Sequence, residues 1–154
     1  MKAKVIINDA SYLAKGYLIS TDKSYLDFDF IFNFLNHQSY WAKGISKEKL
    51  QMAIQESVCF GVYHQQQQIG FARVISDKST FAYLADVFII PTYRKQGLSK
   101  WLVQIILAYA DFKDLRRWLL ATADAHELYK KFGFEPLNQP DRFMQIFTPY
   151  TSTP

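Results

Sequence analysis

The chain has a single cysteine and no long hydrophobic run. Cys59 is the one cysteine among 154 residues, so an internal disulfide is impossible. Its segment is apolar and offers no nearby base, which favours a buried small hydrophobe and leaves a nucleophile as the alternative. No apolar run approaches the roughly 18 residues of a membrane span, and residues 1–8 are too short for a signal-peptide core. We therefore expect a cytoplasmic protein with no membrane partner.

Basic residues are in excess, but they are scattered along the chain. The formal net charge is +4, yet no block of lysine and arginine is longer than two residues. Nucleic-acid binding usually rests on a basic patch, so we predict a local anion site and no nucleic-acid partner. The histidines and acidic residues lack the spacing of metal ligands, so no metal site is predicted.

Length and hydrophobic pattern predict one domain of the α/β (α+β) class. With 49% hydrophobic and 17% aromatic residues, the chain suits a single domain over residues 1–154, with a core from about 16 to 147. Strands are expected at 16–20, 58–63, 69–76, 81–90, 117–122, from 134, and at 142–147, and helices at 26–35, 47–55, 98–111 and 124–133. These make a mixed, mostly antiparallel central sheet of about six to seven strands flanked by about four helices. Gln65–Gln68 should form a turn, and Asp124 should cap the last helix.

The most informative segment runs from Asp86 to Ser99. An apolar strand leads there into a short basic loop with one glycine, Gly97, and then into an amphipathic helix. The unpaired N–H groups and partial positive charge of a helix start predict an anion site. Neither the Walker pattern nor the dinucleotide pattern Gly-x-Gly-x-x-Gly is present. An ordinary strand-to-helix turn with surface charges is the alternative.

Two motifs together resemble a known family. The loop Arg94-Lys-Gln-Gly-Leu-Ser99 is followed about thirty residues later by Glu127-Leu-Tyr-Lys-Lys-Phe-Gly-Phe134. This order resembles the GNAT superfamily of acyl-CoA-dependent N-acetyltransferases, whose loop reads Arg/Gln-x-x-Gly-x-Gly/Ala and whose later helix often carries a Leu-Tyr-x-Lys-x-Gly-Phe run. The resemblance extends from about Gly16 to Phe147. Ser99 replaces the usual small residue, and Thr122 stands where the family often has asparagine.

The resemblance implies a GNAT-like fold and acetyl-CoA as co-substrate. Loop N–H groups would bind the pyrophosphate, with added positive charge from Arg94 and Lys100. The strand before the loop would pair with the pantetheine amides. The cofactor-binding residues expected on this basis are Phe88, Ile89, Ile90, Arg94, Lys95, Gln96, Gly97, Leu98, Ser99 and Lys100.

The resemblance also suggests residues for the chemistry. Tyr129 would lie near the CoA sulfur, and a phenol pKa near ~10 against ~8.5 for a thiol would let it act as general acid; a core tyrosine is the alternative. Asp86 interrupts an apolar strand and is a candidate base or amine anchor, with Arg73 as partner, or else a structural carboxylate. The N–H of Ile89 would polarise the acyl carbonyl.

The acceptor is expected beside the polar loop 36–44. His37, Tyr40 and Trp41 are the residues predicted to line the substrate pocket, or else to anchor this loop to the core. The function we predict is transfer of an acetyl group from acetyl-CoA directly to a primary amine of a small molecule, in a ternary complex. A peptide or protein amine, another acyl donor, or a non-catalytic CoA-binding regulatory module are the alternatives. A homodimer would be consistent with the family.

Overall fold

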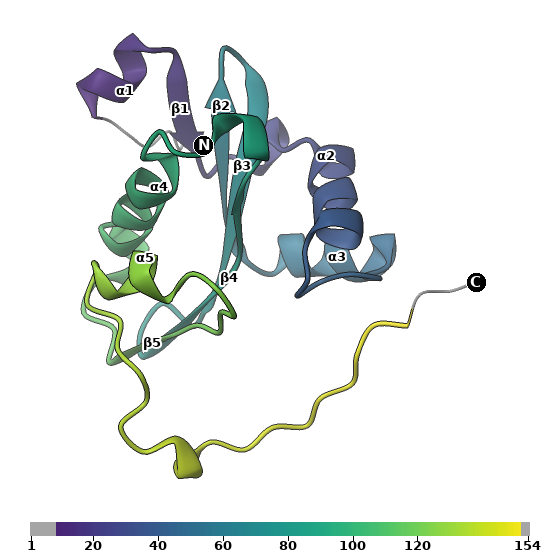
Figure 1. The fold of residues 1–154 in the computed structure, drawn as a ribbon, viewed down its shortest axis with the longest axis vertical. Helices are drawn as coiled ribbons and strands as arrows, with labels where there is room; N and C mark the ends of the chain where they lie inside the picture. The colour runs from purple at the N-terminus through teal and green to yellow at the C-terminus, as the bar shows by residue number, and fades with distance from the viewer. Residues whose placement is uncertain (1–8, 152–154) are drawn as a thin grey trace.

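The computed structural model describes residues 9–151, which form a sheet between two layers of helices (Figure 1). The strands lie in the order β1-β2-β3-β4-β5; the first four are antiparallel and β5 is parallel to β4. Helices α4 and α5 lie on one face, and α2 and α3 on the other. The strands are β1 (Tyr17–Ser20), β2 (Val58–His64), β3 (Gln67–Ser76), β4 (Phe81–Ile89) and β5 (Arg117–Leu119). The helices are α1 (Ala10–Ala14), α2 (Phe28–Asn33), α3 (Lys47–Gln55), α4 (Leu98–Leu107) and α5 (His126–Lys130).

Short helical turns connect several of these elements. A π-helical turn, Phe34–Gln38, extends α2, and 3₁₀ turns lie at Lys23–Tyr25, Pro91–Tyr93, Ala110–Phe112 and Pro140–Arg142. β4 and β5 are parallel, as expected of two strands joined by a crossover through a helix. Among the described residues, none of the helices combines the length and the apolar character that crossing a bilayer requires.

The predicted turn at Gln65–Gln68 is half as long as expected. Only Gln65 and Gln66 adopt the left-handed backbone of a tight hairpin turn, with φ of 48° and 74°. Gln68 belongs to β3 and is buried. Its side chain accepts a hydrogen bond from the N–H of Asp27 (2.7 Å) and donates one to the carbonyl of Gly70 (3.1 Å). Because glutamine is polar, the sequence pattern assigned Gln68 to the turn. It can nevertheless lie in a buried strand, because its amide forms hydrogen bonds inside the protein.

The two strands predicted at the C-terminus are wrong. Within residues 9–151 the sheet has five strands, not six to seven, and neither the segment from Phe134 nor residues 142–147 joins it. The described chain has five α-helices where about four were expected. We call residues 143–151 the C-terminal arm; it crosses beneath the molecule in extended form (Figure 1). Its β-branched and aromatic residues suit a strand, but a strand also needs a neighbour to pair with.

Each face of the sheet has its own hydrophobic core. Phe60, Val62 and Ile106 are fully buried in the core beneath α4. The second core lies toward α2 and α3 and contains Phe71 and Cys59. Cys59 is buried as predicted, and this burial raises the pKa of its thiol to about 11. The thiol therefore stays protonated at neutral pH and is a packing residue.

A β-bulge in β4 shapes the centre of the molecule. Phe71 lies opposite Phe88 and Arg73 lies opposite Ala85, so two residues of β4 face one residue of β3. At the bulge Asp86 has a φ of 56°, which is uncommon for a residue with a side chain. Beyond Tyr83, β4 no longer pairs with β5 in the described structure. The two parallel strands therefore separate and leave a cleft.

Candidate active site

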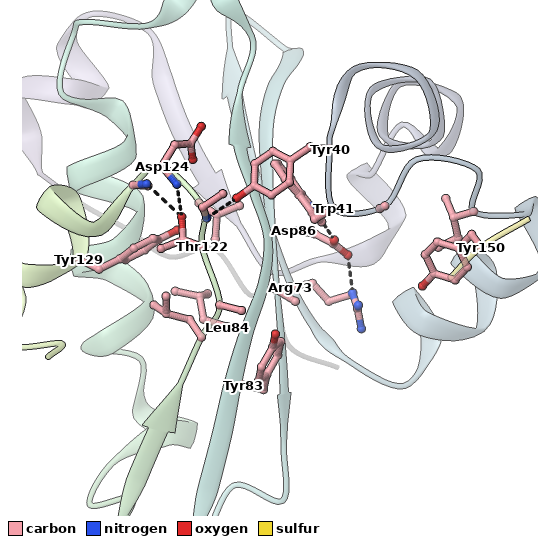
Figure 2. Close-up of a pocket in the computed structure, with 18 residues that line it drawn as sticks. Tyr40, Trp41, Arg73, Tyr83, Leu84, Asp86, Thr122, Asp124, Tyr129 and Tyr150 are labelled. Carbon is pink, nitrogen blue, oxygen red and sulfur yellow. Dashed lines mark hydrogen bonds and ion pairs between the residues drawn. The ribbon is translucent and has the colours of Figure 1, made fainter. Parts of the chain in front are cut away.

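Two hollows lie in succession along this cleft. The large cavity, of about 500 Å³, lies among β4, the loop between α2 and α3, and the segment from β5 to α5 (Figure 2). The loop hollow, of about 310 Å³, lies among the end of β4, the loop before α4, and α5. Helix α5 lines both, through Tyr129 and Leu128 respectively. The two hollows therefore lie next to each other along α5.

The loop before α4 has the backbone of an anion site. Gly97 caps α4 with a left-handed φ of 80° and no side chain caps the helix start. The first bond within the helix is from the N–H of Trp101 to the carbonyl of Gly97 (3.0 Å). The N–H groups that precede Trp101 thus have no partner in the helix. Of the predicted loop residues, the structure gathers Arg94, Lys95, Gly97, Leu98, Ser99 and Lys100 around the loop hollow.

Positive charge converges on the same hollow without an acidic partner. Hydrogen bonding to Lys131 and repulsion from its charge lower the pKa of Lys100, so these two cations lie close together. The Nε of Arg94 donates to the carbonyl of Ile89 (2.9 Å). In the described part of the chain none of these three cations forms a salt bridge with a carboxylate. A bound anion would relieve the repulsion.

Aromatic side chains from α1, β1 and β2 hold this loop in place, which the sequence did not indicate. The hydroxyl of Tyr17 donates to Oε1 of Gln96 (2.8 Å), so Gln96 serves as an anchor of the loop. The hydroxyl of Tyr12 donates to the carbonyl of Gly97 (3.3 Å), and Nδ1 of His64 lies 3.0 Å from the hydroxyl of Tyr93. No sequence pattern pairs residues this far apart in the chain.

The backbone of β4 presents one of the three predicted pantetheine partners to the cleft. Ile90 donates its N–H to Ile69 (3.0 Å) and accepts from the N–H of Tyr93 (3.0 Å), so its backbone is used within the protein. The carbonyl of Ile89 points away from β3, toward Arg94. The N–H and C=O of one strand residue point to the same side, so the N–H of Ile89 also faces the open edge. By the same alternation Phe88 turns toward β3.

Tyr129 points into the large cavity from α5 (Figure 2). The residue is buried, with 8% of its surface exposed. Burial raises the pKa of the Tyr129 phenol to about 12, with smaller contributions from Tyr40 and Asp124. The phenol is therefore protonated at every physiological pH and can donate a proton.

Both ends of α5 are fixed by local hydrogen bonds. The hydroxyl of Thr122 accepts from the N–H of Ala125 (3.0 Å) and, at 3.4 Å, from that of Asp124. The prediction that Asp124 caps this helix is therefore wrong. α5 ends at Lys130, and Gly133, the last residue of the predicted helix 124–133, has a φ of 94° and donates its N–H to the carbonyl of Lys130 (3.1 Å).

The loss of a capping role leaves Asp124 free for another one. It is exposed, lines the large cavity, and its negative charge helps to raise the pKa of Tyr129. It forms no salt bridge with any residue in the range 9–151. Its carboxylate is thus available to a cationic ligand.

Asp86 has the opposite surroundings. Nε1 of Trp41 donates to its Oδ1 (2.8 Å), and Nε of Arg73 donates to its Oδ2 (2.8 Å). Arg73, the partner predicted from the sequence, also donates to the hydroxyl of Ser57 (3.0 Å). Asp86 and Arg73 are largely buried. Because both carboxylate oxygens already accept hydrogen bonds, Asp86 is better placed to hold Trp41 than to receive a proton.

Aromatic rings form the outer wall of the large cavity. The hydroxyl of Tyr40 accepts from the N–H of Ala123 (2.7 Å), so the loop after α2 reaches across the cavity (Figure 2). The Trp41 ring stands nearly perpendicular to that of Tyr40, at 5.1 Å. His37 does not line the cavity, which corrects its predicted place; its ring contacts Phe32 instead. Tyr150 of the C-terminal arm does line it and was not predicted.

Comparisons with known proteins agree with this geometry. Residues 28–134 match the model of the Acetyltransferase (GNAT) family. A candidate acetyltransferase of Gibberella zeae is 33% identical over 135 residues, which are 75% of this chain and 76% of that protein. A crystal structure of a GNAT-family protein of Xanthomonas campestris pv. campestris is 43% identical with a TM-score of 0.86, over 90% of this chain and 97% of that one.

A more distant structure carries a ligand. A Clostridium acetobutylicum protein crystallised with acetyl-CoA has the same fold, with a TM-score of 0.61 at 15% identity, over 85% of this chain and 94% of that one. The family match covers most of the chain, and the 43%-identical structure covers nearly all of it. This chain therefore belongs to the GNAT family of acetyltransferases.

Proposed function

We propose that this acetyltransferase moves an acetyl group from acetyl-CoA directly to a primary amine of a small molecule, with both substrates bound at once. The observation that carries the proposal is that α5 lines both hollows of the cleft, through Tyr129 and Leu128. An anion site lies at one end, the Tyr129 phenol lies along it, and an aromatic cavity with an unpaired carboxylate lies at the other end. The acetyl-CoA bound to the Clostridium relative supports the choice of donor.

The donor would extend from the loop hollow toward the large cavity. Its pyrophosphate would accept from the loop N–H groups that end at Ser99 and Lys100, and the charges of Arg94 and Lys131 would add to the attraction. The pantetheine would continue along the open edge of β4. There the N–H of Ile89 is free to bind the acyl carbonyl.

The bound ammonium group would first lose a proton to solvent at the cavity mouth. The neutral amine nitrogen would then attack the thioester carbon, and the C–S bond would break as the C–N bond forms. Negative charge develops on the carbonyl oxygen, where the N–H of Ile89 would stabilise it. Tyr129 would donate a proton to the departing thiolate, and the second proton lost by the nitrogen would pass through solvent to restore the Tyr129 phenol. No covalent enzyme intermediate is needed, since donor and acceptor meet in one cleft.

The large cavity favours a small acceptor. Its volume of about 500 Å³ is in the range of small-molecule sites. The bridge from Tyr40 to Ala123 closes part of its wall, which disfavours an extended peptide. Aromatic faces and a carboxylate both attract a cationic amine, so we assign Asp124 to bind the ammonium group and Asp86 to position Trp41.

The test is acetyl transfer to a panel of amines and peptides, followed by thiol release and by the mass of the product. We expect Tyr129→Phe to lower kcat by about 100-fold, the size of a lost general acid. Because the pKa of Tyr129 is raised to about 12, the native enzyme should not lose kcat through deprotonation of this acid below about pH 10.

Tyr25→Phe is the matched control, because Tyr25 is an exposed tyrosine that does not line the large cavity or the loop hollow. It should leave kcat unchanged. Acetyl-CoA binding without transfer to any amine would refute catalysis. Full activity of Tyr129→Phe would refute the role of the phenol, and a preference for peptides would refute the small-molecule acceptor.

A further inference from the structure

The residues that line the large cavity leave it with a single net negative charge. Three of them carry a formal charge, namely Arg73, Asp86 and Asp124. The guanidinium of Arg73 pairs with the carboxylate of Asp86 at 2.8 Å, so these two charges cancel. Asp124 forms no salt bridge within residues 9–151. A ligand with one positive charge therefore balances the cavity, whereas a second cation would lose water without gaining a counter-charge.

The cavity offers little to a carboxylate of the ligand. In the described part of the chain, Arg73 is the one cation that lines it. The Arg73 side chain is only 15% exposed, its Nε donates to Asp86, and its Nη1 donates to the hydroxyl of Ser57 (3.0 Å). A ligand carboxylate near Asp124 would meet a like charge, which is strongly unfavourable. An amino acid, whose amine and carboxylate share one carbon, therefore fits this cavity poorly.

Two aromatic side chains near this unpaired carboxylate remain partly uncovered. Tyr40 is 55% exposed and Trp41 is 39% exposed, although both line the cavity. The hydroxyl of Tyr40 accepts from the N–H of Ala123, the neighbour of Asp124 in the chain (Figure 2). The Trp41 ring follows at 5.1 Å from the Tyr40 ring. A ligand ring that packs on these two side chains would thus be a short linker away from an ammonium group at Asp124.

The orientation of the Trp41 ring is fixed from within the protein. Its Nε1 donates to Oδ1 of Asp86 (2.8 Å), and Arg73 holds the other oxygen of the same carboxylate. A largely buried ion pair thus orients a ring that is itself partly exposed at the cavity. A ring that is already held in place loses little freedom when a ligand packs on it. Tyr83 and Tyr150 add further aromatic lining.

We propose that the acceptor is an arylalkylamine: one primary amine joined by a short linker to an aromatic ring, without a carboxylate. This inference rests on the proposed function, because it concerns the acceptor of the same acetyl transfer. The ring would lie against Tyr40 and Trp41, and the ammonium group would bind the carboxylate of Asp124 before it loses its proton. Asp124 lies just before α5, the helix that carries Tyr129, so the amine would be on the side of the proposed acid.

The first test is acetyl transfer to amines that differ from phenethylamine in one property each, with kcat/KM measured by thiol release. Cyclohexylethylamine has a similar shape but no aromatic ring, and its kcat/KM should be roughly 5-fold lower. A linear aliphatic diamine carries a second charge in place of the ring and should be at least ~10-fold poorer. Phenylalanine adds a carboxylate and should be at least ~100-fold poorer. Phenylalaninamide, which is as large but lacks the negative charge, should regain at least ~10-fold of that loss.

The second test removes one of the two rings. Trp41→Leu should lower the ratio of kcat/KM for phenethylamine to that for cyclohexylethylamine at least ~2-fold, because the leucine offers no aromatic face. A partial loss of folded protein would not change this ratio, since both amines report on the same enzyme molecules. Tyr25→Leu is the matched control, because it replaces an exposed aromatic residue that lines neither hollow. It should leave the ratio at its native value.

Calorimetric binding of the same amines to the protein saturated with CoA separates this inference from the proposed function. The affinities should follow the order given for kcat/KM. If no amine is acetylated while this order of affinities holds, the proposed function fails and the ligand class stands. If amines are acetylated but the cyclohexyl amine, the diamine or phenylalanine equals phenethylamine, the arylalkylamine is overturned and acetyl transfer stands. A ratio that Trp41→Leu leaves unchanged would also overturn the placement of the ring.

Discussion

Asp86 and Asp124 line one cavity but have opposite surroundings. Both oxygens of Asp86 accept hydrogen bonds of 2.8 Å, one of them from the largely buried guanidinium of Arg73. Asp124 is exposed and has no ion-pair partner in the described part of the chain. A carboxylate that holds a buried cation contributes to the fold, whereas an unpaired one at a cavity is available to a ligand.

Replacement of each carboxylate by its amide should separate these two roles. Asp86→Asn should lower the free energy of unfolding by about 3 kcal/mol, because Arg73 would remain buried without its counter-charge. Asp124→Asn should leave unfolding unchanged and raise KM for the amine acceptor about 10-fold, the size of one charge-assisted hydrogen bond. Denaturant unfolding and steady-state kinetics of both variants measure these effects. The reverse result, with stability lost at Asp124, would contradict the assignment.

At the scale of elements, the loop before α4 depends on three other elements for its shape. Lys95 and Gly97 both have left-handed backbones, and the loop is tied to β1 through Tyr17 and to α1 through Tyr12. His64 of β2 contacts Tyr93, just before the loop. The loop that forms the anion site is therefore preorganised, without a ligand, by contacts between residues that are distant in sequence.

Tyr17→Phe should remove the hydrogen bond to Gln96 that holds the loop before α4, and it keeps the buried ring. Loss of one hydrogen bond of about 1 kcal/mol predicts a roughly 5-fold rise in KM for acetyl-CoA, with little change in kcat at saturation. The acceptor KM, measured in the same experiments, serves as the internal control because Tyr17 does not line the large cavity. An unchanged acetyl-CoA KM would mean that Gln96 keeps the loop in place unaided.

The elements that the sequence predicted well are those whose signal is local. The helix at 47–55 has both predicted ends, and the loop from Arg94 to Lys100 gathers at one hollow because a strand end and a helix start place it there. The strand at 142–147 failed because pairing depends on a neighbour outside the segment. The sequence did not predict the bulge at Asp86, because a strand pattern that assumes strict alternation of side chains contains no sign of an inserted residue.

The position of Thr122 illustrates a second limit. Aspartate is a common helix cap, so the pattern favoured Asp124, yet the Thr122 hydroxyl accepts the N–H groups at the start of α5. Several residues near a helix start can satisfy the same donors, and backbone geometry selects among them. This has a functional consequence, because the Asp124 carboxylate does not cap α5 and lines the large cavity instead.

At the scale of the whole molecule, β5 lies beside two openings. The cleft on its β4 side contains the proposed reaction site, and further hollows lie between β5 and residues 134–137. The C-terminal arm reaches from β5 to the cleft, because the Phe143 ring lies 5.0 Å from the guanidinium of Arg117 and Tyr150 lines the large cavity. The arm should therefore affect acceptor binding, whereas no residue of the arm lines the loop hollow where the donor would bind.

This dependence, which rests on the proposed function, predicts that Tyr150 affects the affinity for one substrate only. Tyr150→Ala should raise the acceptor KM several-fold, on the order of one lost aromatic contact of about 1 kcal/mol, while the acetyl-CoA KM stays constant. Tyr25→Ala changes an exposed tyrosine outside both hollows and should leave both KM values unchanged. Steady-state kinetics with each substrate varied in turn measure these effects. An acceptor KM that Tyr150→Ala does not change would show that the cavity binds its acceptor without the arm.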